Sequence, residues 1–198
     1  QKCKSIFLKQ QDQYRPDFFR SGKYRKDVDG LEESDFKKYF KKHSETTISN
    51  LGYIPIDKIL QSNYLDFGCG AGILLRLLSP FIEKGIGIEL DKGYHFNEGN
   101  ITVVGDFESS DNLTSKFDLI TSFSVIGQVE DPLNIIRKFK ERLNPGGLLL
   151  IADINSQDIL LSEAMVSYSK VFFRQSYLNY FSSEGLKSIA QKVGLTHL

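Results

Sequence analysis

The stretch Tyr64-Leu65-Asp66-Phe67-Gly68-Cys69-Gly70-Ala71-Gly72 decides the fold of this chain. It begins as a short apolar strand and runs into three glycines at alternate positions. The apolar run Ile73–Leu78 follows directly and predicts a helix. Glycines at a strand-to-helix turn allow a tight backbone and the close approach of a ligand. Taken alone, the motif leaves a second interpretation open, which is a tight turn that binds nothing.

Short apolar runs alternate with helical stretches from residue 64 onward. The predicted strands are Tyr64–Phe67, Ile86–Leu90, Ile101–Val104, Phe117–Ser122 and Leu148–Ile154. The connectors are Ile73–Leu78, a short turn after Asp91, and a helix at Asp131–Leu143 with Asp131 as N-cap and Pro132 in its first turn. This alternation predicts an α/β fold, a Rossmann-like doubly wound and mostly parallel sheet with helices on both faces.

Two regions differ in composition. Residues 1–60 form an N-terminal arm whose first part is rich in lysine, arginine and aromatic residues, with predicted helical segments at Glu33–Lys42 and Ile56–Leu60. We expect its rings to pack over a substrate cleft or onto the core. Residues 61–198 form the predicted cofactor-binding domain, which ends with a helix at Ser183–Val193.

Composition excludes several classes of protein. The chain has 198 residues, and 25 basic side chains balance 25 acidic ones, so no global charge attracts nucleic acid or an anionic membrane. Only Cys3 and Cys69 are present, which rules out a disulfide framework or a cysteine metal cluster. No apolar run reaches the roughly 18 residues of a membrane span, and the start does not resemble a signal peptide. We therefore expect a cytoplasmic protein without a metal site.

Two acids follow predicted strands at the edge of the sheet that carries the glycine loop. Glu89 lies at the end of the second strand, where a carboxylate can accept hydrogen bonds from both ribose hydroxyls and repels a 2′-phosphate. Asp106 follows the third strand, and Phe107 beside it could cover a ring. Asp106 alone also fits an ordinary turn acid.

Five segments in order resemble the motifs of class I S-adenosylmethionine-dependent methyltransferases of the small-molecule type. They are Leu65-Asp66-Phe67-Gly68-Cys69-Gly70-Ala71-Gly72, Gly85-Ile86-Gly87-Ile88-Glu89, Gly105-Asp106-Phe107, Phe117-Asp118-Leu119-Ile120 and Asn144-Pro145-Gly146-Gly147-Leu148. The resemblance implies that S-adenosylmethionine is the cofactor. The implied cofactor-binding residues are Asp66, Gly68, Gly70, Gly72, Glu89, Asp106, Phe107, Ser122 and Phe123. The glycines would surround the methionine part, Glu89 the ribose, Asp106 and Phe107 the adenine, and Ser122 and Phe123 the reacting methyl.

An NAD-dependent oxidoreductase is an alternative, because it would use the same sheet and the same acid. The glycines here lack the G-x-G-x-x-G spacing, since position 73 is Ile. Asp66 before the loop would repel a pyrophosphate and suits a cationic cofactor better. A methyltransferase-like domain without catalysis, serving as an interaction scaffold, is the other alternative.

Methyl transfer from a sulfonium needs a nucleophile that is held close and aligned, so the sequence need not contain a catalytic dyad. Candidates for a general base are Asp153, His43 and the tyrosines of residues 168–180, and none of them is singled out. Gln128 stands where many small-molecule family members carry a histidine. Cys69 is interpreted as a packing residue, and His95 and His197 as surface residues.

The acceptor is expected to be a small molecule. The region after the fourth predicted strand lacks the Asp/Asn-Pro-Pro-aromatic signature of enzymes that methylate bases, so nucleic acid is disfavoured. Gln128, Tyr168 and Arg174 are candidate acceptor-binding residues. Family members continue into two more strands, so we expect a sheet that lacks its last strands, in a trimmed chain or a part of a longer protein. The sequence predicts nothing about the oligomeric state.

Overall fold

The computed structural model describes residues 3–7, 16–28, 30–31, 36–107, 115–162, 168–169, 172–174 and 176–198. The first residues of the predicted helix at Glu33–Lys42 therefore lie outside the described residues. The chain forms two compact units. Unit 1 contains residues 1–14, 124–141 and 152–198, and unit 2 contains residues 15–123 and 142–151. The boundary predicted at residues 60 and 61 stays a prediction.

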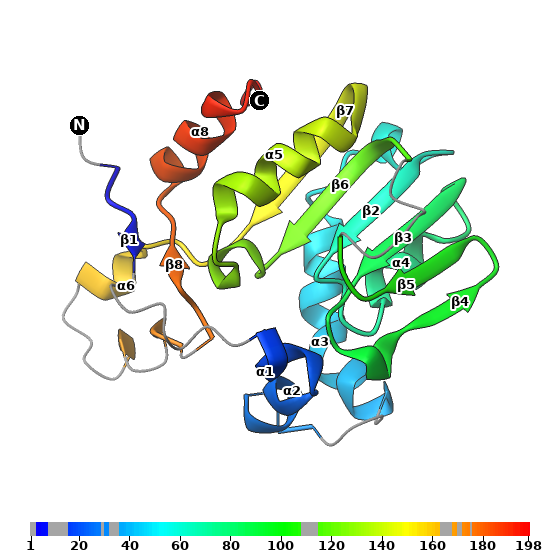
Figure 1. The fold of residues 1–198 in the computed structure, drawn as a ribbon, viewed down its shortest axis with the longest axis horizontal. Helices are drawn as coiled ribbons and strands as arrows, with labels where there is room; N and C mark the ends of the chain where they lie inside the picture. Colours follow the sequence, from blue (N-terminus) through cyan, green and yellow to red (C-terminus); the bar gives the residue numbers. More distant parts are fainter. Residues whose placement is uncertain are drawn as a thin grey trace. The chain divides into compact units, whose positions relative to one another are not determined.

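Unit 2 holds the six-stranded sheet, whose order is β4-β5-β3-β2-β6-β7 (Figure 1). The strands are β2 (Asn63–Phe67), β3 (Lys84–Ile88), β4 (Phe96–Glu98), β5 (Ile101–Val104), β6 (Phe117–Phe123) and β7 (Leu143–Ala152, with its last residue in unit 1). β2 pairs in parallel with β3 and β6, and β3 pairs in parallel with β5. The predicted α/β class with a mostly parallel sheet is confirmed.

Three details of the sheet differ from the prediction. β3 lies two residues earlier than the predicted strand Ile86–Leu90, at Lys84–Ile88. β4 pairs antiparallel with β5 at one edge, where only a turn, now seen as η2 (Lys92–Tyr94), was expected. A strand of three residues with exposed Asn97 and Glu98 carries almost no apolar pattern. β7 starts at Leu143 rather than Leu148. The side-chain amide of Asn144 donates to Asp118 of β6 (2.7 Å), which holds the beginning of β7 against that strand.

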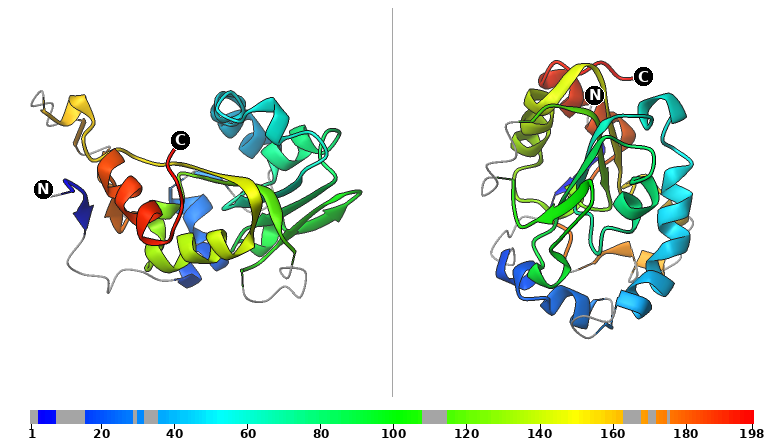
Figure 2. Two further views of the ribbon diagram at one scale, coloured as in Figure 1. Left: turned by 90° about the horizontal axis from the view of Figure 1, so that it is seen from above. Right: turned by 90° about the vertical axis from the view of Figure 1, so that its right-hand side faces the viewer.

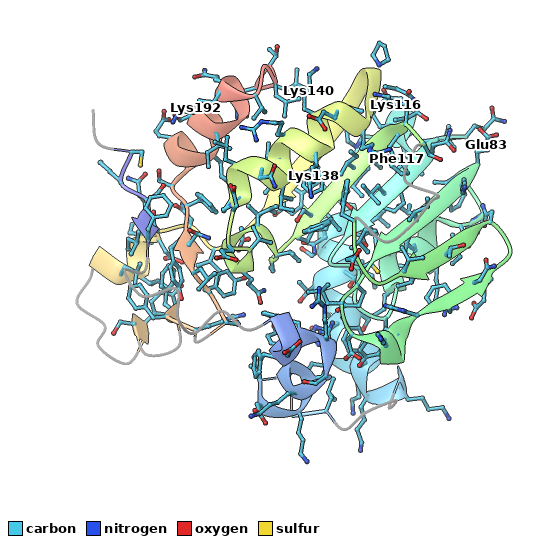
Figure 3. The ribbon with its side chains drawn as sticks, in the orientation of Figure 1. Glu83, Lys116, Phe117, Lys138, Lys140 and Lys192 are labelled. Atoms are coloured by element: carbon cyan, nitrogen blue, oxygen red, sulfur yellow. The ribbon has the colours of Figure 1, made fainter. Side chains whose placement is uncertain are left out.

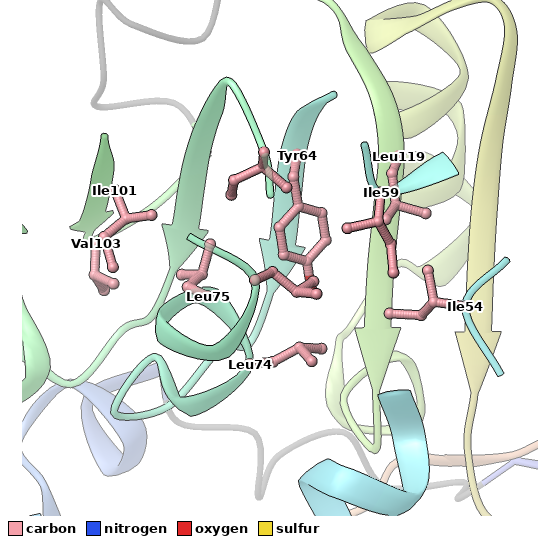
Figure 4. Packing of buried hydrophobic residues seen from close by; sticks show 10 residues of the cluster. Ile54, Ile59, Tyr64, Leu74, Leu75, Ile101, Val103 and Leu119 are labelled. Atoms are coloured by element: carbon pink, nitrogen blue, oxygen red, sulfur yellow. The ribbon is translucent and has the colours of Figure 1, made fainter. Parts of the chain in front are cut away.

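Helices α3 (Phe36–Leu51) and α4 (Ile73–Leu78) lie on the same face of the sheet (Figure 2). The helix predicted at Glu33–Lys42 is longer than expected, because α3 continues to Leu51. The short helix η1 (Ile56–Lys58) follows it. The core between α4 and the strands is apolar (Figure 4). Its buried members are Ile54, Ile59, Tyr64, Leu74, Leu75, Leu78, Ile82, Ile101, Val103 and Leu119. Unit 2 also contains two short helices, α1 (Pro16–Arg20) and α2 (Lys23–Asp27), that no sequence pattern indicated.

Unit 1 contains η4 (Ile126–Gln128), α5 (Pro132–Arg142, whose last residue belongs to unit 2), α6 (Ile159–Ser162) and α8 (Ser183–Lys192). β1 (Ile6–Phe7) pairs antiparallel with β8 (Asn179–Tyr180), so the N-terminal segment joins the C-terminal region of the chain. Asp131 caps α5 as predicted, because its side chain accepts the N–H of Asn134 (3.0 Å). Of the helices in the described ranges, none combines the length and the apolar character needed to cross a membrane.

Candidate functional site

The glycine loop, Glu89 and Asp106 come together at the carboxyl edge of the sheet in unit 2. The N–H groups of Gly68 and Cys69 donate to the carbonyl of Ile88 at the end of β3 (2.8 and 3.1 Å). The N–H of Glu89 donates to the carbonyl of Val104 at the end of β5 (2.9 Å). Because the carboxyl ends of parallel strands meet at one edge, these bonds place the loop beside both acids.

The carboxylate of Glu89 is tied to the glycine loop. Oε2 accepts the N–H of Gly70 (2.9 Å) and Nη2 of Arg25 (3.0 Å), and Oε1 accepts the N–H of Asp91 (3.0 Å). Glu89 is 8% exposed. The ion pair with Arg25 compensates for part of the cost of burying this charge.

The contact of Arg25 on α2 with Glu89 was not predicted from the sequence. Its guanidinium lies over the rings of Tyr24, Tyr39 and Tyr94, 5.0 to 5.3 Å from their centroids. Arg25 and Glu89 are 64 positions apart, so no local pattern joins them. The available signal was the mixture of basic and aromatic residues in the arm, which predicted packing but no particular partner.

The space around two of the loop glycines is filled by aromatic side chains. Gly70 has φ +55°, and a Cβ there would collide with the hydroxyl of Tyr39. Gly72 has φ +69°, and its Cβ would lie 2.8 Å from Cζ of Phe96 on β4. Glycine is therefore required at both positions by the backbone angle and by these neighbours, in addition to any ligand.

Asp66 is buried beneath the glycine loop and belongs to a short hydrogen-bonded chain. The hydroxyl of Thr121 donates to Oδ1 of Asp66 (2.7 Å), and the hydroxyl of Tyr64 lies 2.7 Å from the Thr121 oxygen. Burial raises the pKa of Asp66 to about 7, against the effect of the two hydroxyls, and the nearby charge of Glu89 adds to the rise.

The other predicted cofactor residues lie at the ends of β5 and β6. Asp106 is half-buried, and Phe107 is buried with its ring centroid 6.0 Å from that of Phe67. Ser122 is fully buried, and no atom of the described residues forms a hydrogen bond with its hydroxyl. Phe123 packs against the core. The same edge of unit 2 therefore contributes all the predicted cofactor residues.

Two residues near the loop are structural. Burial raises the pKa of the Cys69 thiol well above its ordinary value, and the carboxylates of Asp66 and Glu89 raise it further, as suits a packing residue rather than a nucleophile. His95 was expected at the surface, but it is half-buried, with Nε2 2.7 Å from the carbonyl oxygen of Glu89.

In the part of the chain that the structure describes, no His, Cys, Asp and Glu side chains group as a metal ion would require.

The three candidate acceptor residues belong to unit 1, and the side chains of two of them have separate hydrogen-bond partners. The amide of Gln128 donates to the carbonyl of Ser124 (2.6 Å), and the hydroxyl of Tyr168 donates to the carboxylate of Asp158 (2.6 Å). Arg174 is exposed. Their joint role in binding an acceptor stays a prediction.

Among the candidates for a general base, Asp153 is a partly buried carboxylate of unit 1. Oδ2 accepts the N–H of Gly127 and Oδ1 that of Ile154, both at 2.7 Å. Burial raises the pKa of Asp153. In unit 2, the ring of His43 packs on Tyr39 with the centroids 4.3 Å apart.

Known proteins resemble this chain over most of its length. The sequence profile of the methyltransferase domain family matches residues 30–198. The ubiquinone biosynthesis O-methyltransferase of Actinobacillus pleuropneumoniae is 31% identical over 105 residues, which cover 46% of this chain and 45% of that protein. The protein of the same name from Pseudomonas aeruginosa is 23% identical over 156 residues, 67% of each chain. A solved S-adenosylmethionine-dependent methyltransferase from Thermotoga maritima has a TM-score of 0.61 at 20% identity, covering 88% of this chain and 80% of that one.

The chain spans about half the length of the Actinobacillus relative. The profile match covers the glycine loop, both strand-end acids and the rest of the chain to its last residue. The structural likeness independently agrees on the fold. These findings favour the methyltransferase interpretation over the NAD-dependent one. The chain therefore belongs to the methyltransferase domain family and is one of its class I, S-adenosylmethionine-dependent members with a Rossmann-like fold.

Proposed function

We propose that the chain binds S-adenosylmethionine at the carboxyl edge of the sheet in unit 2 and promotes transfer of its methyl group to a small-molecule acceptor. The observation that carries this proposal is the Glu89 carboxylate at the end of β3. It is fastened to the glycine loop by the N–H of Gly70 (2.9 Å), so one acid joins the two motifs that a ribose-bearing ligand would contact.

The residues present fit such a cofactor in charge and in hydrogen bonding. Asp66, Glu89, Asp91 and Asp106 make this edge acidic, which suits a ligand with a sulfonium and an ammonium group. The buried hydroxyl of Ser122, which lacks a hydrogen-bond partner among the described residues, provides a polar group that a ligand could satisfy.

Each residue then has a proposed role. Glu89 accepts hydrogen bonds from the ribose hydroxyls, and Asp106 and Phe107 contact the adenine. The loop glycines Gly68, Gly70 and Gly72 surround the methionine part, with Asp66 beneath them. Ser122 and Phe123 line the region of the reacting methyl.

When bound, the cofactor supplies a methyl group on a good leaving group. The residues of the chain then need to orient the acceptor and exclude water rather than form a covalent intermediate. If the acceptor must lose a proton, Asp153 is the proposed base, because burial raises the pKa of its carboxyl group and a higher pKa makes the carboxylate a stronger base.

The names of the two relatives favour a hydroxyl acceptor, because both are O-methyltransferases. The buried aromatic group of unit 1, formed by Phe172, Tyr177 and Tyr180, is consistent with a planar or partly apolar acceptor. Gln128, Tyr168 and Arg174 are the proposed polar contacts. The cytoplasmic location stays a prediction.

Glu89→Gln is expected to weaken S-adenosylmethionine binding by about 30- to 100-fold, because it removes the charge that strengthens two hydrogen bonds to the ribose. Isothermal titration with S-adenosylmethionine, and with NAD for comparison, measures this loss. Glu83→Gln is the matched control, because Glu83 is exposed and precedes the opposite end of the same strand (Figure 3). Equal binding by both variants, or a preference of the wild type for NAD, would contradict the proposed site.

A further inference from the structure

Arg25 forms an ion pair with the Glu89 carboxylate, the group that the proposed function assigns to the ribose. The side chains of Arg25 and Glu89 are 11% and 10% exposed. Nη2 of Arg25 donates to Oε2 of Glu89 at 3.0 Å, while Nε lies 4.0 Å from Asp91. The guanidinium therefore lies at the acidic edge itself rather than on a remote surface.

The acceptor positions of Glu89 are nearly all in use. A carboxylate oxygen can accept about two hydrogen bonds. Oε2 already accepts the N–H of Gly70 and Arg25, and Oε1 accepts the N–H of Asp91. Counting the donors among the described residues, one position remains, on Oε1. Two ribose hydroxyls need two positions, and the bonds from Gly70 and Asp91 belong to the backbone that shapes the loop. Arg25 is thus the donor whose departure makes room for a diol.

The side chain of Arg25 also lies close to the glycine loop, together with that of Tyr39 on α3. Nη2 of Arg25 lies 3.4 Å from where a Cβ of Gly70 would stand, and the Tyr39 hydroxyl is nearer still. The three tyrosine rings around the guanidinium keep it in place through cation–π contacts. In contrast, α2 itself has only five residues, none of them buried, and it starts after Gly22 with φ +72°. Because α2 is short and none of its residues is buried, little buried surface opposes its movement away from Glu89.

We propose that Arg25 is a latch that competes with the cofactor ribose for Glu89, so that α2 must release this acid before the cofactor binds. This inference rests on the proposed function, since it requires the cofactor to bind at Glu89. If the latch is open in only a fraction of the molecules, the apparent affinity is the intrinsic affinity multiplied by that fraction. Removing it should therefore strengthen the binding of any ligand that carries the ribose diol.

Arg25→Gln is expected to tighten binding of adenosine and of S-adenosylhomocysteine by a similar factor, about three- to tenfold, and to raise their association rates. Titration and stopped-flow binding with both ligands measure this change. Lys26→Gln is the matched control, because Lys26 is an exposed cation next to Arg25 on the same helix. It should leave both affinities within twofold of the wild type. Thermal unfolding of each variant checks that the fold is intact.

The choice of two ligands separates the latch from a simpler role of Arg25. Adenosine has the diol but no carboxylate, whereas S-adenosylhomocysteine has both. Weaker binding of S-adenosylhomocysteine with unchanged adenosine binding would mean that Arg25 contacts the ligand carboxylate, and would overturn the latch. Unchanged or weaker adenosine binding in Arg25→Gln would overturn it as well.

A double-mutant cycle provides the second measurement. In the ligand-free protein, Arg25→Gln and Glu89→Gln should show non-additive changes in stability, because the pair exists before the ligand arrives. Additive changes would overturn the latch even if binding improved. Failure of the proposed function gives a different result, in which neither the wild type nor Arg25→Gln binds either ligand although the two substitutions remain coupled.

Discussion

Leu75→Ala is expected to lower the free energy of unfolding by about 3 to 5 kcal/mol, because it empties a filled position in the core of unit 2. Leu75 has no exposed surface. It packs where two glycines of β3 leave room. Its Cδ2 lies 2.9 Å from the place of a Cβ on Gly85, and its Cδ1 lies 2.6 Å from that of a Cβ on Gly87. The strand cannot relax into the cavity easily, since it is paired on both sides.

Urea unfolding at fixed pH measures this loss, provided that the slope of the transition is unchanged. Leu77→Ala is the matched control, because Leu77 lies on the same helix but is 38% exposed. Its loss should stay below about 1 kcal/mol. Similar losses for the two variants would mean that α4 does not pack on β3 as described.

Asp66→Asn is expected to make stability less dependent on pH. The folded protein binds the Asp66 proton more tightly than the unfolded chain does, because burial raises the pKa from 3.8 to about 7. Ionisation between these two values therefore lowers the free energy of unfolding, with an upper limit on the order of 4 kcal/mol above pH 7. The asparagine variant carries no such charge, so its advantage over the wild type should grow by about 2 to 3 kcal/mol from pH 5 to pH 8.

Urea unfolding of both proteins at pH 5 and pH 8 gives the difference in their free energies of unfolding at each pH. The change in that difference between the two pH values does not depend on any pH-independent effect of the amide group. Asp57→Asn is the control, because Asp57 is exposed on η1. It should follow the wild type at both pH values. If the Asp66→Asn curve also follows the wild type, then Asp66 does not titrate in this range.

The charge of Asp66 is also expected to strengthen binding of a cationic cofactor. An ionised carboxylate without a cationic partner is costly in this buried position. A cofactor with a sulfonium charge would offset that cost, so Asp66→Asn should weaken S-adenosylmethionine binding more than binding of S-adenosylhomocysteine, which lacks the sulfonium. Titration of both ligands at pH 8 tests this difference, and equal losses would count against a direct charge interaction.

Most of the sheet could be predicted from the sequence. Its buried parallel strands are continuous apolar runs, and β2, β5 and β6 begin within one residue of the predicted positions. β4 was missed because three partly exposed residues have no such run. The early start of β7 was missed because the Pro-Gly-Gly sequence after α5 indicates a turn, whereas the contact of Asn144 with Asp118 on β6 aligns this segment with the sheet.

The sequence by itself determined the fold class, the order of the motifs and the two strand-end acids, because these depend on local patterns and on the rule that parallel strands end at one edge. Only the tertiary structure decided what surrounds them. Arg25 reaches Glu89 across 64 positions, and Thr121 reaches Asp66 across 55. Such partners are chosen by packing and charge among side chains that folding brings together, and no periodicity in the chain encodes that choice.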